Sequence, residues 1–219
     1  MIVYHLSDAQ HALSNIALRR IKISQFADLN DPFEFLGADL RDKVLRKAFR
    51  ATKDELRKDK GLLCFSRSWE NPVLWSHYAD KHRGVCLGFD VRDELLDPVI
   101  YTDKPMKVPR DPKTKQSKPS EEFMRALLYT KFIDWAYEEE LRVFVQLDND
   151  TIESGLYFHP FSRDIKLREV ILGPRCELPI NSIRKLVSKF NPKVIVIKSR
   201  VAYTKFKVVE NRVATRTKA

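Results

Sequence analysis

Apolar and polar positions along this chain repeat with two different spacings. Short apolar runs and alternating segments, bounded by turn residues, are typical of strands, whereas apolar residues every three or four positions are typical of helices. The chain has no internal repeat and no sharp linker. It therefore predicts one α+β domain over residues 1–219, with a mixed, mainly antiparallel central sheet flanked by helices. The predicted strands are 2–5, 21–24, 61–65, 85–89, 99–102, 135–147, 156–159, 165–172, 193–197 and 203–209.

Helix-start signals precede several of the amphipathic segments. Asn71-Pro72 is such a signal, because proline tolerates the first helical turn. Ser120 is a second candidate cap, and Glu121-Glu122 after it suit the first turn of a helix. Pro179 is predicted at the first position of a third helix. The predicted helices are 8–20, 39–58, 73–79, 120–134 and 179–190.

The stretch 60–90 reads as strand, loop, short helix and strand, and it organises the rest of the chain. Ser66 and Arg67 form a polar exit from the first strand, and the helix carries Trp75 and Tyr78 three positions apart. Polar and aromatic residues at the end of a buried strand are more typical of a site than of packing alone. Each aromatic is also an ordinary core residue, and we expect that role for some of them.

Composition and charge narrow the class of protein. The hydrophobic content is 43% and the charged content 32%, as in soluble globular proteins, and the net charge is +10. Much of the excess charge lies in the segments 41–60, 104–118 and 198–218. A basic loop at about 103–119 is predicted to be flexible, and the residues at about 210–219 are predicted to form a basic C-terminal tail. A basic surface favours nucleic acid as a partner, but it also occurs as a merely solvated surface.

Targeting and cysteine patterns indicate the cytoplasm. No apolar run approaches the ~20 residues of a membrane span, and no signal peptide is visible, so no membrane partner is predicted. Cys64, Cys86 and Cys176 are widely spaced and odd in number, which argues against a disulfide framework or a zinc site. Cys64 and Cys86 lie in apolar strand patterns and are predicted to be core thiols.

Several kinds of chemistry lack their sequence signatures. His77 and His82 are five positions apart, which does not align them on one helix face, so no metal site is predicted. The chain has only six glycines, none of them clustered, so phosphate-binding glycine loops are absent. No GxSxG motif is present for a serine nucleophile.

Three consecutive carboxylates, 138–140, form the sharpest chemical feature. If 135–147 is one strand, Glu138, Glu140 and Arg142 share a face. One interpretation is an exposed polar face with a Glu140–Arg142 pair. Another is an E-x-E pair facing a cleft, where a carboxylate binds a ribose hydroxyl and stabilises an oxocarbenium-like transition state. Metal-dependent nucleases also use such carboxylates, together with further acids and a lysine.

Four motifs resemble those of a bacterial and archaeal family named only as a domain of unknown function. They are NDPFE at 30–34, CFS at 64–66, LWSHYADKHRGVCLGFD at 74–90 and WAYEEELR at 135–142. Their order and spacing fit over roughly residues 1–175. Some members of that family are associated with antiphage or toxin-like settings, and the resemblance extends that expectation to this chain.

The order of elements also resembles the ADP-ribosyltransferase fold, which carries three separated motifs. The matching segments here are Tyr4-His5, FSRS at 65–68 and Glu138-x-Glu140. The resemblance implies that His5 holds NAD, that Ser66 braces a catalytic Glu140, and that Trp75 or Tyr78 flanks the nicotinamide. The candidate residues are Glu138 and Glu140 for catalysis, and Tyr4, His5, Ser66, Arg67, Trp75 and Tyr78 for cofactor binding.

Three functions follow from these observations. The first is an NAD-using enzyme with an ADP-ribosyltransferase-like fold, acting as a transferase or as an NAD glycohydrolase. The second is a nucleic-acid-binding or nuclease module, which rests on the basic charge. The third is a non-enzymatic sensor or interaction protein, in which the 75–90 block is purely structural.

Overall fold

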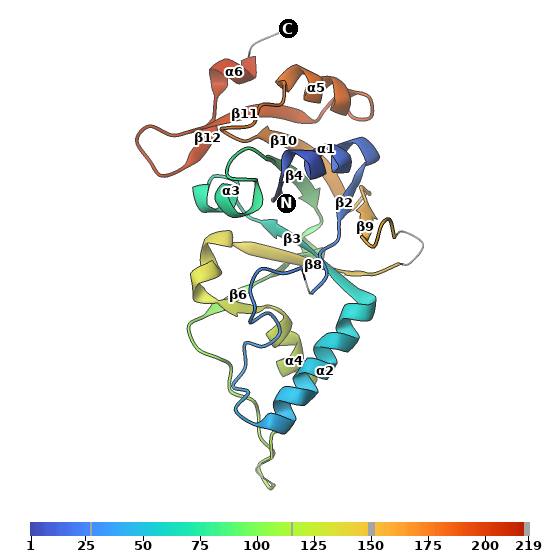
Figure 1. Cartoon of the computed structure of the whole chain (residues 1–219), viewed down its shortest axis with the longest axis vertical. Coiled ribbons are helices and arrows are strands. Elements are labelled where there is room, and N and C mark those ends of the chain that lie inside the picture. Colours follow the sequence, from blue (N-terminus) through green and yellow to red (C-terminus); the bar gives the residue numbers. More distant parts are fainter. Residues whose placement is uncertain (27, 115, 149–151, 217–219) are drawn as a thin grey trace.

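The computed structural model of this chain describes residues 1–26, 28–114, 116–148 and 152–216 (Figure 1). Its centre is one large sheet with the strand order β12-β11-β10-β4-β1-β3-β8-β5. β10 and β11 pair in parallel and the other neighbours are antiparallel, so the predicted α+β class with a mixed, mainly antiparallel sheet is confirmed. Its strands are β1 Ile2–Ser7, β3 Lys60–Ser66, β4 Val85–Val91, β5 Asp97–Pro98, β8 Glu140–Gln146, β10 Ile165–Leu172, β11 Ile195–Val201 and β12 Val208–Glu210.

Two small sheets and several helices surround the large sheet. β2 pairs with β9, and β6 pairs with β7. Their bounds are β2 Arg20–Lys22, β9 Phe158–Pro160, β6 Ile100–Thr102 and β7 Thr130–Phe132. The α-helices are α1 Ala9–Leu18, α2 Lys43–Asp59, α3 Pro72–Tyr78, α4 Glu121–Leu128, α5 Ile180–Ser188 and α6 Arg212–Arg216, and the 3-10 helices are η1 Asp93–Leu95 and η2 Ile133–Glu138.

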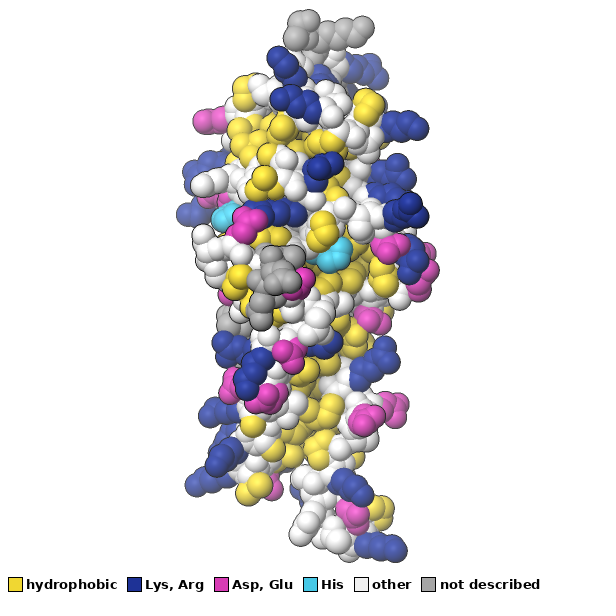
Figure 2. Space-filling model, turned by 90° about the vertical axis from the view of Figure 1, so that its right-hand side faces the viewer, with side chains coloured by type: hydrophobic (Ala, Val, Ile, Leu, Met, Phe, Trp, Pro, Cys, Tyr) yellow, Lys and Arg dark blue, Asp and Glu magenta, His cyan; other side chains and the backbone are white. Residues whose placement is uncertain are grey.

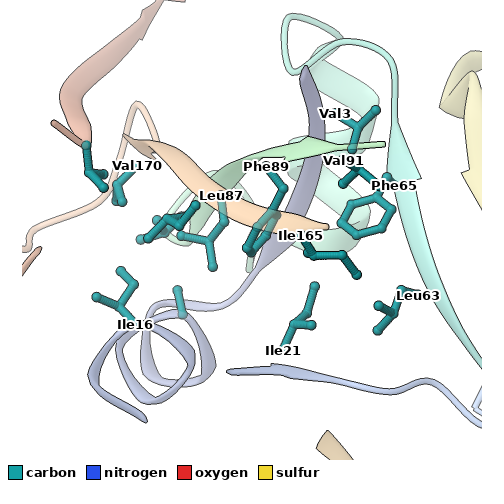
Figure 3. Close-up of a cluster of buried hydrophobic side chains, with 14 of the residues drawn as sticks. Val3, Ile16, Ile21, Leu63, Phe65, Leu87, Phe89, Val91, Ile165 and Val170 are labelled. Atoms are coloured by element: carbon teal, nitrogen blue, oxygen red, sulfur yellow. The ribbon is translucent and has the colours of Figure 1, made fainter. Parts of the chain in front are cut away.

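The large sheet has two apolar faces, because successive side chains of its central strands point to opposite sides and are apolar on both. On β4, Leu87 and Phe89 pack with residues of α1 and α5 such as Ile16, in the cluster drawn in Figure 3. Cys86, one position away, belongs to a cluster on the other face with Trp75 of α3. Successive strand residues point to opposite faces, and helices cover both, which is why β4 reads as a continuous apolar run.

A third apolar cluster lies at the lower end of the molecule in Figure 1, away from the two faces of the sheet. α2 and α4 pack there around Phe35, Phe49 and Phe123. A hollow of about 1180 Å³ runs between these helices and the loop around Arg110. Figure 2 shows hydrophobic side chains reaching the surface between rows of charged ones along the long axis of the molecule.

Local signals predicted many element boundaries correctly. The Asn71 side chain accepts a hydrogen bond from the Val73 amide and caps α3, and Ser120 caps α4 through the Phe123 amide. β10 covers the predicted residues 165–172. The helix predicted at 39–58 instead begins at Lys43, because the Asp42 side chain caps it. Pro179 is the N-cap of α5 rather than its first residue.

Two predicted strands are shorter in the structure than the sequence pattern predicts. The segment 135–147 begins as the 3-10 helix η2, and β8 starts only at Glu140, because Glu139 adopts a left-handed conformation with φ of 45°. The segment 203–209 is mostly a loop, and only β12 at its end pairs with β11.

The predicted C-terminal tail contains α6 before residues 217–219, which lie outside the described part. The flexibility of the loop 103–119 and the single-domain boundary stay predictions. Among the described residues, no helix is long and apolar enough to cross a membrane.

Candidate functional site

The large sheet splits between β1 and β3. β1 pairs with β4 along its whole length, but with β3 only at Tyr4 opposite Ser66. Beyond that pair, Ser24 takes the place beside β3: its amide and carbonyl both bond to Leu62, at 2.9 Å each. The two strands therefore diverge around a wedge. A pocket of about 300 Å³ lies in it.

The pocket gathers segments that are far apart in the sequence. One wall comes from 4–6 of β1 and another from 64–66 of β3. The others come from α3, from the loop that contains Asp28–Asn30, and from the charged end of η2 and β8. Tyr4, Ser66 and Glu140 are direct neighbours across three adjacent strands, because Ser66 pairs with Tyr4 on one side and with Glu140 on the other.

Most of the predicted site residues line this pocket. The two exceptions are Trp75 and Arg67. Trp75 is fully buried, and its indole N–H donates to the Trp69 carbonyl oxygen at 2.6 Å, so its ring supports α3 from inside the core. Arg67 is exposed at the exit of β3. The residues that do line the pocket are Tyr4, His5, Ser66, Tyr78, Glu138 and Glu140.

A buried arginine lies at the centre of the charged wall. Arg142 has no exposed side-chain surface, and it binds two carboxylates at once. Its Nε and Nη2 donate to the two oxygens of Glu140 at 2.8 and 3.0 Å, and its Nη1 and Nη2 donate to those of Glu34 at 3.0 and 2.5 Å. Nη1 also donates to the Leu128 carbonyl oxygen at 2.8 Å. The Glu140–Arg142 pair is therefore buried, which rules out the interpretation of this segment as an exposed polar face.

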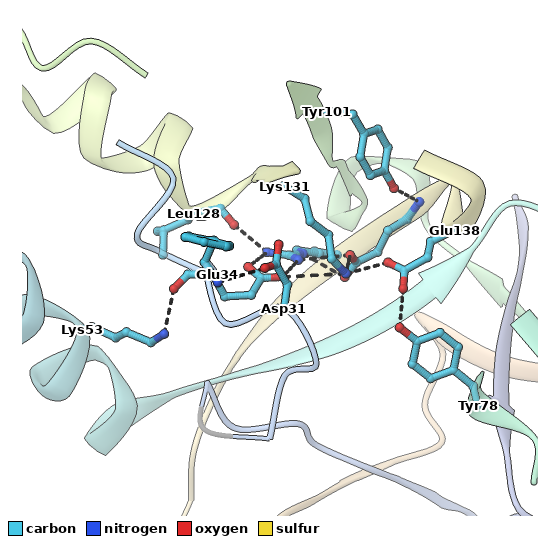
Figure 4. Close-up of polar contacts among 11 residues, drawn as sticks. Asp31, Glu34, Lys53, Tyr78, Tyr101, Leu128, Lys131 and Glu138 are labelled. Carbon is cyan, nitrogen blue, oxygen red and sulfur yellow. Dashed lines mark hydrogen bonds and ion pairs between the residues drawn. The ribbon is translucent and has the colours of Figure 1, made fainter. Parts of the chain in front are cut away.

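Lys131 extends this network towards the pocket (Figure 4). Its ammonium group donates to Glu138 at 2.6 Å and to Glu140 at 3.2 Å, and lies 3.8 Å from Glu34. The other oxygen of Glu138 accepts the hydroxyl of Tyr78. Two cations thus face three carboxylates, which leaves one negative charge in excess if all are ionised. The wall consequently favours a ligand that carries positive charge.

A left-handed residue brings the two carboxylates of the E-x-E motif together. Glu138 ends η2, Glu139 turns the chain, and Glu140 begins β8. The Glu140 amide donates to the Tyr101 hydroxyl at 2.9 Å, which fixes the turn from the other side. The sequence prediction that Glu138, Glu140 and Arg142 lie together is met through this turn, and not through a continuous strand.

The two carboxylates differ in proton affinity and in free capacity. Burial raises the pKa of Glu138, and Lys131 and Tyr78 offset only part of that effect. Burial would also raise the pKa of Glu140, but Arg142 and Lys131 outweigh it and lower the pKa below its usual value. Lys131 and Arg142 alone donate three hydrogen bonds to Glu140, whereas Glu138 accepts one from Lys131 and one from Tyr78. Since a carboxylate offers about four acceptor positions, Glu138 has more room for a ligand hydroxyl.

These opposite shifts predict opposite pH dependences of stability. Because the folded pKa of Glu140 lies below its unfolded value of about 4.3, its stabilisation is present above that pH and is lost as the pH falls through the folded pKa. The raised folded pKa of Glu138 has the reverse effect: its contribution is present below the unfolded pKa and is lost as the pH rises through the folded one. Urea unfolding from about pH 3 to about pH 7 should therefore show a growing cost of Glu140→Gln and a shrinking cost of Glu138→Gln. Costs that move in the same direction would contradict these assignments.

His5 bridges the two sides of the wedge. Its Nδ1 lies 3.1 Å from the Cys64 carbonyl oxygen. A carbonyl oxygen only accepts, so Nδ1 carries the proton. Burial lowers the pKa of His5, which keeps the ring neutral and leaves Nε2 as an acceptor. Within the described part of the chain, no protein group bonds to that Nε2. The ring can therefore accept a hydrogen bond from a ligand in the pocket.

The two strand cysteines have different surroundings. Cys86 is fully buried, as predicted for a core thiol. Cys64 is only partly buried and lines the pocket, which corrects its prediction as a core residue. Burial and the Glu140 carboxylate raise the pKa of the Cys64 thiol well above its usual value. Since the thiolate is the nucleophile, this thiol is a poor one.

Several charged and polar residues of the site were missed by sequence reasoning. Glu34 is not among the predicted site residues, yet it is 2% exposed and binds Arg142. Its position between Phe33 and Phe35 was the available signal, because a carboxylate in an apolar setting needs a buried partner. Lys131 had no such signal. Also missed were Asn30 and His77, which line the pocket, and Tyr137, whose hydroxyl lies 2.7 Å from His77 Nδ1.

Comparison with known families agrees with part of this picture. Residues 74–143 match the model of a family described as a protein of unknown function (DUF2971). The matched segment runs from α3 into β8 and contains Tyr78, Lys131, Glu138, Glu140 and Arg142. The segments around Tyr4 and Ser66 lie outside it, so the wider resemblance stays a prediction. No curated protein and no solved structure matches the chain.

Proposed function

We propose that this protein is an NAD-using enzyme of the ADP-ribosyltransferase-like type, acting as a transferase or as an NAD glycohydrolase. One observation carries the proposal: three segments chosen from sequence meet at the same level of three adjacent strands. Tyr4, Ser66 and Glu140 are paired neighbours there, and Glu138 lies beside them in the wall of one pocket.

The pocket suits the ribosyl-nicotinamide part of NAD. Tyr4, Tyr78 and His5 supply ring surfaces and hydrogen-bonding groups, and the excess negative charge of the wall favours the cationic nicotinamide ring. When the bond between the ribose C1′ and the ring nitrogen breaks, its electron pair leaves with nicotinamide. Positive charge then develops on the ribose C1′ and ring oxygen, where a nearby carboxylate stabilises it. Water or a target nucleophile completes the reaction at C1′.

The two glutamates take different roles in this proposal. Glu138, with its free acceptor positions, binds the ribose hydroxyl and meets the developing charge. Glu140, to which the family resemblance gives the catalytic role, is held by Arg142 and Lys131. In this proposal its negative charge stabilises the developing positive charge without a hydrogen bond to the ribose. Ser66 positions the chain beside Glu140, since its hydroxyl donates to the Ser68 carbonyl oxygen at 2.9 Å and accepts from the Ser68 amide. We also propose that the protein acts in the cytoplasm, in antiphage defence or as a toxin.

Calorimetric titration with NAD and with ADP-ribose tests whether the pocket is the binding site. Asn30 is exposed on the rim of the pocket, so Asn30→Trp should obstruct the entrance without disturbing the core. We expect saturable binding by wild type and a loss of about tenfold or more in Asn30→Trp, equivalent to about 1.4 kcal/mol. Lys47→Trp, on the exposed surface of α2, is the matched control and should bind like wild type. Absence of binding by folded wild type, or equal binding by both variants, would remove NAD from the proposal.

A further inference from the structure

The loop between β11 and β12 carries two aromatic side chains that lie outside the packed core. Tyr203 is 87% exposed and Phe206 is 99% exposed. Rings of this size are normally buried, and an exposed pair on one short loop costs solubility unless it has a partner. In Figure 1 this loop projects from the upper part of the molecule beside β12.

Positive charge surrounds these two rings. The Arg200 guanidinium lies 4.5 Å from the centroid of the Tyr203 ring, and Lys205 stands between the two aromatics in the sequence. From residue 193 to residue 209 the chain contains no aspartate or glutamate. α6, which packs beside β11, adds the exposed Arg212 and Arg216. The loop therefore presents ring faces among an excess of positive charge, with the Glu70 and Glu210 carboxylates confined to its base.

The base of the loop is firmly anchored, so the exposure of the rings is a property of the fold. The Ala202 amide donates to the Lys207 carbonyl oxygen at 2.9 Å and closes the hairpin. Val208 is fully buried, and its amide donates to the Glu70 carbonyl oxygen at 2.8 Å. Lys207 also pairs with the Glu70 carboxylate at 2.6 Å. These contacts hold the hairpin against the segment that joins β3 to α3.

We propose that the β11–β12 hairpin binds single-stranded nucleic acid. Tyr203 and Phe206 stack on bases, and Arg200 and Lys205 neutralise phosphates. Only a single strand offers both partners at once, because bases in a duplex hide their faces in the stack. An acidic protein would pair with the cations, but it would not explain why two aromatic rings are exposed together. This inference concerns a surface separate from the pocket and does not depend on the proposed function.

Fluorescence anisotropy with labelled oligo-dT and oligo-rU of about 12 nucleotides tests the aromatic half of the proposal. We expect the Tyr203→Ala/Phe206→Ala double variant to bind about tenfold or more weakly than wild type, since stacking on each ring contributes measurably. Phe33→Ala removes another exposed aromatic, 62% exposed, and should bind like wild type. A duplex of the same length should bind more weakly to wild type and respond little to the double variant.

The cationic half is tested by the salt dependence of the same binding. Arg200→Gln/Lys205→Gln should lower the slope of log K against log salt by about 0.7 for each cation removed. The control, Lys47→Gln/Arg50→Gln on exposed α2, should leave the slope unchanged.

Three results would overturn the proposal. The first is oligonucleotide binding that the hairpin variants leave unchanged. The second is an equal loss in the hairpin and control variants. The third is the absence of oligonucleotide binding together with hairpin-dependent binding to vesicles that contain phosphatidylserine, which would identify the hairpin as a membrane-surface contact.

Discussion

Arg142→Met should cost about 3–5 kcal/mol of unfolding free energy at neutral pH, a large share of the stability of an ordinary domain. The guanidinium group is fully buried between Glu34 and Glu140, and methionine leaves these two buried carboxylates with only the Lys131 ammonium, which also pairs with Glu138. Urea unfolding followed by circular dichroism measures the loss. Arg41→Met is the matched control: Arg41 is exposed and pairs with Asp39 at the surface, so its loss should cost less than about 1 kcal/mol.

A second background separates lost charge from lost packing. In a Glu34→Gln/Glu140→Gln protein, the same Arg142→Met change should cost much less than in wild type, because no unpaired carboxylate is left behind. An Arg142→Met cost below about 1 kcal/mol in wild type would contradict the buried network. An equal cost in both backgrounds would assign the effect to packing.

The sequence predicted best those elements whose signals are local. β10 could be bounded because its apolar run ends at Gly173-Pro174, and the capping side chains Asn71 and Ser120 were readable from their positions. The strand predicted at 203–209 was wrong because Tyr203 and Phe206 look like strand residues, yet lie exposed on a loop. An apolar residue in a pattern indicates burial only where a partner exists, and the sequence does not show partners.

The candidate site shows the same limit over longer distances. That Glu138, Glu140 and Arg142 lie together could be predicted, because they are close in the sequence. Their burial could not, because it depends on Glu34, which lies 108 positions from Arg142 along the chain. The left-handed turn at Glu139 was also invisible, since glutamate has no preference for that conformation. Contacts of this kind are set by the fold, and only the assembled sheet reveals them.

Glu138→Gln should slow the cleavage of NAD by about 100-fold or more. The substitution keeps the size of the side chain but removes the negative charge that, in our proposal, meets the oxocarbenium-like ribose. Loss of one such stabilising group typically costs 10²–10³ in rate, or about 2.7–4 kcal/mol. The wild-type rate should also fall as the pH falls through the raised pKa of Glu138, because only the ionised carboxylate stabilises the developing charge.

Glu139→Gln is the matched control for this change. Glu139 is the neighbouring residue, carries the same charge and is exposed, and its side chain is not part of the pocket wall. The net charge of the protein changes equally in both variants. A difference between them therefore reports the position of the Glu138 carboxylate. Circular dichroism spectra of the three proteins should coincide, which separates lost activity from lost folding.

The proposed role of Glu138 is tested most directly by the rate at which nicotinamide is released from NAD by wild type, Glu138→Gln and Glu139→Gln at equal concentration. We expect steady release by wild type and Glu139→Gln, and release about 100-fold slower by Glu138→Gln. Folded wild type that releases no more nicotinamide than heat-denatured protein, or three variants with equal rates, would contradict that role.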